Sequence, residues 1–522
     1  MKKILMFFIT CGIIVGLIIG LKSQPQVNEE KNIQNETIQV STKDASEINL
    51  SISDIDTLNP LRTKNSHIAD ILKLIYDPLI SYDYEHQIEA CLAKEWAKKD
   101  ELTWIIKLRE NVLWHGGEKF TSEDVKYTIE TLMKNEILSP YASNVVNIKA
   151  VDIVDDVTIV LTLNEKDPYI MAKLTFPIIP RYYFKNEGIV DEEKSNRPVG
   201  TGAYKYFENT DEKLTLVANE EWWQDVEIRL KKINLKKYTT YGEAVKAFKS
   251  SEVDMIMTTM YNWKEKFGFI GINSFGFESS KYEVIIPNAQ NKILKEPAVR
   301  RAILQAINRE NIVSDIYDES ASIQDIPIAS VSKYQTKSTE YDLEKSKQTL
   351  INAGWTQTTS GWSKENKKLK FTLIVPENDV EKIAVAEKIK EDLNEISINI
   401  TIKKLSWDSF KKAIESDAFE LALATLEIKN EYQIQDMVAT ENIYNYANYT
   451  NLEMDKTIEN LKKYESEEYA REFEVFKQIY ESQMPYIGLY FKENTILTNK
   501  SVKGEYKSTN YNPYRNIINF CK

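Results

Sequence analysis

Residues 104–132, WIIKLRENVLWHGGEKFTSEDVKYTIETL, decide the fold, because their periodicity passes from strand to turn to helix. The first residues form a short apolar run of the kind found in strands. The pair Gly116-Gly117 supplies backbone angles that a Cβ forbids, which predicts a turn. Thr121, with Asp124 three residues later, is typical of the first turn of a helix. This unit is built for packing and contains no evident catalytic group.

Length and composition limit the classes of protein that fit. At 522 residues the chain is too long for a single core and should fold into about two or three domains. A hydrophobic content of 42% and an aromatic content of 11% exclude general disorder. The net charge of −12 argues against binding to nucleic acid, because no domain is basic enough to neutralise phosphates.

The N-terminal segment predicts export. Lys2 and Lys3 precede residues 4–21, which contain no charged side chain and would span roughly 27 Å as a helix, close to the thickness of a bilayer core. The lysines favour an orientation that leaves the body outside the cytoplasm. We expect residues 1–22 to be an uncleaved membrane anchor, with cleavage as the alternative. Cys11 lacks the small residue that normally precedes a lipidated cysteine, so a lipoprotein is less favoured.

Two further expectations concern the chain beyond this segment. Residues 23–45 are polar and are expected to form a tether. Cys91 and Cys521 show no disulfide framework and are expected to be unpaired.

The rest of the chain alternates between strands and helices. A βαβαβ succession is expected from strands at 371–375, 398–403 and 419–428 and helices at 379–396 and 406–415. The last of these strands is apolar on both faces, which is typical of a central parallel strand. A hairpin is expected at residues 151–163, and one long helix at residues 296–317. The fold class is therefore α/β, with more than one lobe.

No recognisable catalytic motif is present. The histidines His67, His86 and His115 lack the spacing of metal ligands, and His115 is best explained as part of the glycine turn. Gly200-Thr201-Gly202 has Lys205 where a dinucleotide-binding loop needs its third glycine, so it is interpreted as a tight turn. We expect no metal, no cofactor and no enzyme activity. A secreted hydrolase is the alternative from another class.

Short motifs along the whole exported chain carry a resemblance. They lie at residues 57–61, 76–79, 92–96, 104–132, 199–204, 219–223, 251–254, 297–302, 306–310, 341–346, 353–355 and 484–489. In this order they resemble the family 5 extracellular solute-binding proteins, the oligopeptide- and dipeptide-binding receptors of ABC importers. Each motif is weak alone, but the ordered set is specific.

The resemblance implies a two-lobed fold of the periplasmic-binding-protein type (class II) with an inserted domain and a ligand cleft between the lobes. It implies a discontinuous lobe I at residues 46–76, 199–282 and 494–522, an inserted domain at residues 77–198, and lobe II at residues 283–493. The function implied is capture of a peptide outside the cytoplasm by a monomer that delivers it to a membrane permease, with ATP hydrolysis left to other subunits.

The resemblance also indicates candidate ligand-binding residues. Residues 139–143 resemble the family segment whose tyrosine contacts the peptide, which indicates Tyr141. Residues 406–410 resemble the segment whose tryptophan lines a side-chain pocket, which indicates Trp407. Lys64 and Ser66 fall where contacts to the peptide backbone are expected.

One departure concerns the ligand's amino terminus. Where oligopeptide receptors place an aspartate that pairs with the α-amino group, this chain has Lys429. A buried ammonium without a counter-charge is strongly disfavoured. Glu427 is therefore expected to take this role, with Thr425 as a neighbouring ligand-binding residue. Alternatively, the ligand lacks a free amino terminus, as in a modified or signalling peptide or a metal chelate.

Overall fold

The computed structural model describes residues 46–134, 139–184, 192–260, 262–268, 270–428, 430–464 and 466–522. The expected anchor at residues 1–22, the tether at residues 23–45, Cys11 and Lys429 lie outside the described residues. The described residues belong to one compact unit, Ala45–Lys522. Within the described ranges, no helix has both the length and the apolar character needed to cross a membrane.

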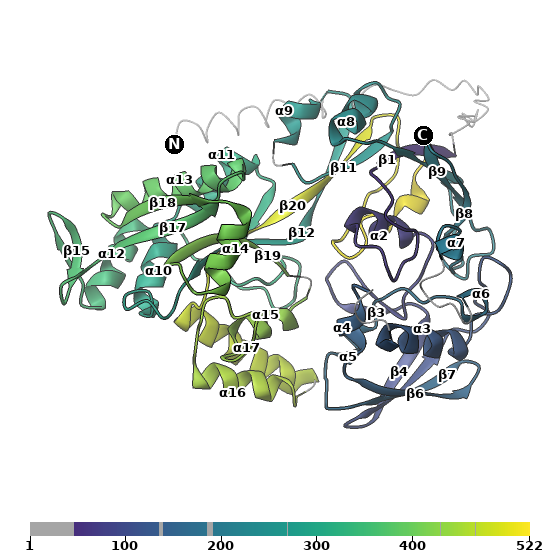
Figure 1. The fold of residues 1–522 in the computed structure, drawn as a ribbon, viewed down its shortest axis with the longest axis horizontal. Helices are drawn as coiled ribbons and strands as arrows, with labels where there is room; N and C mark the ends of the chain where they lie inside the picture. Colours follow the sequence, from purple (N-terminus) through teal and green to yellow (C-terminus); the bar gives the residue numbers. More distant parts are fainter. Residues whose placement is uncertain are drawn as a thin grey trace, which may run out of the picture. The chain divides into compact units, whose positions relative to one another are not determined.

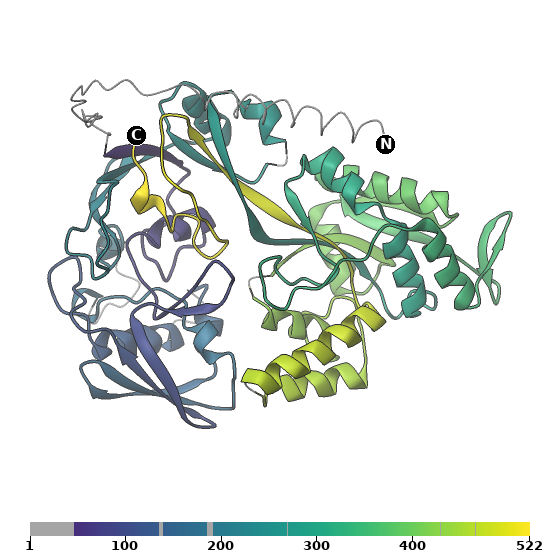
Figure 2. The ribbon, with the colours of Figure 1, turned by 180° about the vertical axis from the view of Figure 1, so that it is seen from behind.

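An 11-stranded sheet runs through this unit and connects its parts. Its order is β18-β17-β19-β12-β20-β11-β1-β10-β9-β8, and β13 pairs with β20. The two longest strands, β12 (Ile272–Pro287) and β20 (Ile487–Asn499), pair antiparallel in the middle of this order. They run from lobe I, which contains β1 and β8–β11, into lobe II, which contains β17–β19 (Figures 1 and 2). Because both strands pass through both lobes, the boundaries at 282/283 and 493/494 stay a prediction.

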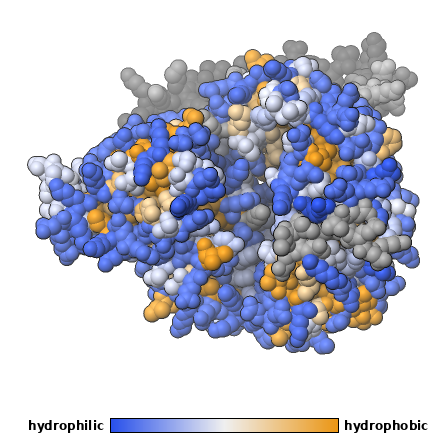
Figure 3. Space-filling view, in the orientation of Figure 1, coloured by the Kyte–Doolittle hydropathy of each residue, from blue (hydrophilic) through white to orange (hydrophobic). Residues whose placement is uncertain are grey.

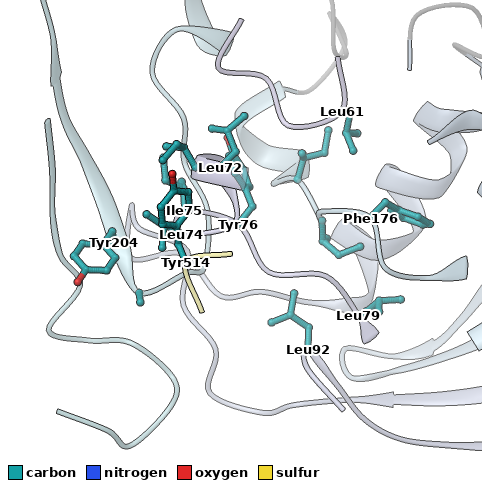
Figure 4. Close-up of a cluster of buried hydrophobic side chains, with 14 of the residues drawn as sticks. Leu61, Leu72, Leu74, Ile75, Tyr76, Leu79, Leu92, Phe176, Tyr204 and Tyr514 are labelled. Carbon is teal, nitrogen blue, oxygen red and sulfur yellow. The ribbon is translucent and has the colours of Figure 1, made fainter. Parts of the chain in front are cut away.

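Lobe I is built around α2 and five shorter strands. The strands are β1 (Glu47–Ile52), β8 (Tyr204–Asn209), β9 (Lys213–Ala218), β10 (Lys232–Lys237) and β11 (Met255–Thr258), and the helices are α2 (Ser66–Leu72), α8 (Tyr241–Lys249), α9 (Trp263–Phe267) and η2 (Ile517–Asn519). Leu72, Ile75 and Tyr76 gather with Tyr204 and Tyr514 in one buried cluster (Figure 4). Segments from both ends of the described chain therefore share this core.

The inserted domain contains a separate four-stranded sheet. Its order is β4-β5-β7-β6, from β4 (Ala93–Asp100), β5 (Thr103–Leu108), β6 (Ile148–Asp155) and β7 (Thr158–Leu163). The other elements are β2 (Ile80–Tyr82), β3 (Ile88–Ala90), α3 (Ser122–Lys134), α4 (Ala142–Val145), α5 (Ile170–Lys173), α6 (Arg181–Phe184) and α7 (Glu192–Ser195). The hairpin expected at residues 151–163 is confirmed as β6 and β7.

The strand, turn and helix expected in residues 104–132 are confirmed as β5, a turn and α3. Gly117 has φ +93°, a conformation that favours glycine. The Asp124 carboxylate accepts hydrogen bonds from Thr121 N at 2.9 Å and from Trp114 Nε1 at 3.2 Å. Asp124 therefore caps α3 and ties it to the turn at the same time.

His115 links this turn to the turn formed by Gly200-Thr201-Gly202. Its Nε2 donates to the Gly202 carbonyl at 3.0 Å, and Gly200 N donates to its Nδ1 at 3.3 Å. Burial lowers the pKa of His115 to about 4, so the ring is neutral at pH 7. In the described structure, His115 is a turn residue.

Lobe II surrounds the other end of the sheet with helices. The strands are β13 (Ala321–Ile323), β14 (Thr356–Thr358), β15 (Gly361–Lys364), β16 (Lys367–Lys368), β17 (Lys370–Pro376), β18 (Asn399–Leu405) and β19 (Leu421–Glu427). The helices are α10 (Pro297–Ala306), α11 (Arg309–Tyr317), α12 (Leu343–Asn352), α13 (Val380–Glu395), α14 (Trp407–Glu415), α15 (Tyr432–Val438), α16 (Leu452–Leu461) and α17 (Ser466–Gln483). The face of the molecule in Figure 3 is mostly hydrophilic, with apolar residues in small groups.

Two expectations for lobe II were wrong. The single helix at residues 296–317 is two helices, because Ile307 is extended and Asn308 begins α11 by accepting a hydrogen bond from Asn311 N at 3.0 Å. The strand expected to be parallel to its neighbours, β19, is parallel to β17 but antiparallel to β12. The reason is that β12 enters the sheet from lobe I in the opposite direction.

Candidate ligand-binding site

A cavity of about 370 Å³ lies between the two lobes. Its walls come from the β2–β3 hairpin, the segment around α5, β12, the loop after β13, the segment after β19, and α17. The sequence separates these segments by hundreds of residues, and the long strands bring them together. Ligand sites of proteins commonly have volumes of about 300–1,000 Å³ and lie between domains.

Aromatic side chains form much of the wall. The tyrosines that line the cavity are Tyr82, Tyr169, Tyr334, Tyr432, Tyr464, Tyr469 and Tyr511, together with Trp104 and Phe491. Tyr82 stacks on Tyr511 with ring centroids 3.8 Å apart. Such rings offer a large apolar surface and a negative face that attracts cations.

Tyr169 joins the inserted domain to lobe II at the edge of the cavity. Its ring stacks on Tyr432, with centroids 5.1 Å apart, and meets the edge of Tyr469 at 5.9 Å. Its hydroxyl accepts a hydrogen bond from Gln435 Nε2 at 2.5 Å. These contacts hold the two sides of the cavity together.

Two carboxylates face the cavity, Glu278 from β12 and Glu431 from lobe II. Glu278 accepts hydrogen bonds from Ser330 N at 3.0 and 3.3 Å, and Glu431 accepts one from the hydroxyl of Ser332. Burial raises the pKa of both groups, although these hydrogen bonds act in the opposite direction. In the part of the chain that the structure describes, neither carboxylate has a lysine or arginine within ion-pair distance.

Two amide oxygens of the cavity wall are also buried without a hydrogen-bond partner in the described part of the chain. They are the Oδ1 atoms of Asn430 and Asn510. Lys333 is the lysine among the lining residues, and its Nζ lies 5.1 Å from the centre of the Tyr334 ring. The lining therefore presents more acceptors and negative charge than donors, and an occupant that supplies N–H groups and positive charge would satisfy it.

None of the six candidate residues from the sequence belongs to this lining. Tyr141 is partly buried beside Phe176, with ring centroids 6.5 Å apart, and burial raises its pKa to about 12. Trp407 is 58% exposed at the beginning of α14. Lys64 and Ser66 are exposed at the N-terminal side of α2.

The other two candidates lie on β19. Thr425 donates a hydrogen bond to Glu283 at 2.9 Å and accepts one from Lys382 at 2.5 Å, so it belongs to a group of charges inside lobe II. Glu427 is exposed at the end of β19, with Ile428 of the cavity next to it. Since neither residue lines the cavity, all six candidates stay a prediction.

Sequence reasoning missed Glu431 and Tyr432, which do line the cavity. They lie just beyond the carboxyl end of β19, and ligands in α/β sheets bind at the carboxyl ends of strands. The available signal was an acidic residue followed by a tyrosine at this place, two residues after Lys429.

Comparisons with known proteins agree with this architecture. The sequence model of the bacterial extracellular solute-binding proteins, family 5 Middle, matches residues 87–430. The chain is 25% identical over 496 residues to the oligopeptide-binding protein AppA of Bacillus subtilis, and the match covers 90% of each chain.

Two solved structures share the fold. AppA from Bacillus subtilis in complex with a nonapeptide has a TM-score of 0.64 and 23% identity, covering 91% of this chain and 98% of that one. NikZ from Campylobacter jejuni in complex with Ni(L-His) has a TM-score of 0.68 and 21% identity, covering 92% of this chain and 100% of that one. The expected two-lobed α/β fold is confirmed. The chain belongs to the bacterial extracellular solute-binding proteins of family 5.

Proposed function

We propose that this protein captures short peptides with a free amino terminus in the interlobe cavity and delivers them to the permease of an ABC importer. The observation that carries the proposal is the excess of acceptors in the cavity, where Glu278, Glu431, Asn430 and Asn510 face the same space. An α-ammonium group supplies positive charge and three N–H donors, so it complements these groups.

The rest of a peptide also suits this lining. Backbone N–H groups complement the unpaired oxygens of Asn430 and Asn510, and the tyrosine walls accept side chains of many shapes. At about 370 Å³ the cavity holds only a short peptide or the first residues of a longer one. The oligopeptide-binding function in the name of the Bacillus subtilis relative supports the same class of ligand.

A metal chelate fits the cavity less well. An anionic chelate would face Glu278 and Glu431, whose charges repel it. Across the described ranges, no cluster of three or more His, Cys, Asp or Glu side chains is arranged to hold a metal ion. The observations therefore favour a cationic ligand over a chelate.

In this proposal the protein works as a monomer outside the cytoplasm and has no catalytic activity of its own. Residues 1–22 anchor it to the membrane, and residues 23–45 act as the tether. Cell fractionation tests the anchor: the full chain should be found with membranes, whereas a variant lacking residues 1–22 should leave them. Release of the full chain into the medium would contradict anchoring.

The ligand is tested by native mass spectrometry of the full-length protein in detergent, followed by calorimetry. We expect co-purified peptides, and we expect tripeptides with a free amino terminus to bind at least about tenfold more tightly than their N-acetylated forms. Glu431→Gln should reduce this preference, whereas Glu441→Gln, at an exposed position of lobe II, should retain it. Binding of a nickel–histidine chelate together with no heat from any peptide would overturn the proposal.

A further inference from the structure

Glu278 has a second glutamate, Glu493, as its neighbour on the adjacent strand. It lies on β12 directly opposite Glu493 on β20, and the two residues are register partners in the antiparallel pair. Glu278 lines the cavity, whereas the carboxylate of Glu493 lies over Gly276, where an added Cβ would approach its Oε2 to 2.7 Å. Like charges directly opposite each other on a sheet are unfavourable. The main strands that join the lobes therefore carry two negative charges side by side.

Among the residues that the structure describes, no lysine or arginine forms an ion pair with Glu278 or Glu493. The nearest lysine along β20 is Lys492, but successive side chains of a strand point to opposite faces, and Lys492 bonds to Glu283 and Glu381 on the other face. Throughout the described residues, neither Glu278 nor Glu493 has an ion-pair partner. The groups that donate hydrogen bonds to Glu278 in the described structure are neutral, and Ser330 N is one of them.

The pair lies close to Glu431 but is distinct from it. Ser330 N donates to Glu278, and the hydroxyl of Ser332 donates to Glu431, so one short loop touches both carboxylates. Both carboxylates also line the same cavity of about 370 Å³, which places them within reach of one ligand. Lys333 lies on this loop, and its charge lowers the pKa of Glu431.

We propose that Glu278, reinforced by Glu493, is a second cation subsite, so that this protein selects peptides whose first residue is lysine or arginine. The inference rests on the proposed function, in which Glu431 receives the α-ammonium group. The basic side chain of the same residue then extends along the tyrosine wall to Glu278, where its charge removes the repulsion between the paired carboxylates. A neutral first residue fills the same space but leaves both carboxylates without a counter-charge.

The test compares Lys-Ala-Ala with Leu-Ala-Ala by calorimetry on the full-length protein. The wild type should bind Lys-Ala-Ala at least about tenfold more tightly, because a desolvated charge pair contributes at least that much. Glu278→Gln should abolish the preference, and a melting temperature without ligand no lower than that of the wild type shows that the variant is folded. Glu493→Gln should reduce the preference in part, and the exposed control Glu441→Gln should keep it.

The outcomes separate this inference from the proposed function. Equal affinity of the wild type for the two tripeptides, or a preference that survives in Glu278→Gln, would overturn the second subsite and leave peptide binding intact. Binding of 1,5-diaminopentane but of neither tripeptide would support two cation subsites and overturn the peptide proposal. Absence of binding by all three compounds would overturn both.

Discussion

Lys382 and Glu283 form an ion pair inside lobe II, with Nζ 2.5 Å from Oε1 and with side chains only 6% and 1% exposed. Lys492 lies 3.3 Å from the other oxygen of Glu283. Removing the carboxylate leaves two ammonium groups in a buried place, so Glu283→Gln should lower the free energy of unfolding by about 3–5 kcal/mol. Urea denaturation at pH 7 measures the effect.

The matched control for this change lies on the same strand. Glu278 has no cationic partner among the described residues, and burial raises its pKa, so Glu278→Gln removes an unfavourable charge. We expect Glu278→Gln to leave the ligand-free protein as stable as the wild type or more stable. If both variants lost the same free energy of unfolding, the ion pairs of Glu283 would not be the cause of its contribution to stability.

The pH dependence of the Glu283 contribution follows from its pKa. Burial alone would raise that pKa, but the charges of Lys382 and Lys492 outweigh burial and lower it. The stability that ionised Glu283 adds is therefore complete above the usual glutamate pKa of about 4.3 and is lost as the pH falls through the lowered value. The difference between wild type and Glu283→Gln should shrink below about pH 4. A constant difference from pH 7 to pH 3 would contradict this assignment.

Peptide affinity should depend on pH through Glu431. Burial raises its pKa, while the hydrogen bond from Ser332 and the charge of Lys333 act in the opposite direction. A cationic ligand needs the ionised carboxylate, so affinity should be complete above the raised pKa and should fall as the pH is lowered through it. This fall begins at a higher pH than an ordinary glutamate with a pKa of about 4.3 would give.

Calorimetry in two buffers of different ionisation enthalpy checks this expectation, because binding near the raised pKa releases a proton from the protein. Glu431→Gln should bind more weakly and release fewer protons, and the proton release that remains reports Glu278. The same proton release in wild type and Glu431→Gln would count against Glu431 as the ammonium partner.

The contact between Tyr169 and Tyr432 should contribute to affinity. Tyr169→Ala removes the stack and the acceptor for Gln435, which together join the inserted domain to lobe II. Since an aromatic pair contributes about 0.5–1.5 kcal/mol, peptide affinity should fall about two- to tenfold. Tyr169→Phe keeps the aromatic ring, so its peptide affinity should fall less than that of Tyr169→Ala. Affinity that is unchanged in Tyr169→Ala would mean that closure does not use this contact.

Gly200 should tolerate no side chain. An alanine Cβ there would lie 1.9 Å from the carbonyl oxygen of Ile75, and backbone cannot move aside as a flexible side chain can. Gly200→Ala should lower the unfolding free energy by about 1–3 kcal/mol or more. At Gly242 in α8 an added Cβ would meet Thr240 Oγ1 at 4.0 Å, an ordinary contact distance, so Gly242→Ala should stabilise the protein by about 0.5–1 kcal/mol. Similar thermal shifts in the two variants would contradict the close approach.

Local contacts explain which elements the sequence predicted. The cap formed by Asp124 lies within three residues of Thr121, and the β6–β7 hairpin turns within a few residues, so both are visible in a short window. The break between α10 and α11 was missed because neither glycine nor proline marks it; Asn308 caps α11 with its side chain. The antiparallel neighbour of β19 was missed because β12 comes from more than a hundred residues away.

The cavity could not be predicted from the sequence, because its lining residues are also far apart in the chain. Glu278, Glu431 and Tyr169 come from three distant segments, and only the paired long strands bring them together. The resemblance identified the family, but it indicated Glu427 as the partner of the amino terminus and not Glu431, which lies two residues past Lys429. Burial and missing partners, which single out Glu278 and Glu431, are properties of the folded chain and not of any motif.

The path of β20 through both lobes has a consequence for synthesis at the ribosome. Lobe II lies between β12 and β20 in the chain, so all of its strands have been translated once β20 is complete. The core of lobe I still lacks Tyr514, Ile517 and Phe520 at that moment, although its first strand was made more than four hundred residues earlier. The lobe that is translated first is therefore finished last, and its apolar residues must be kept from aggregating while the other lobe folds.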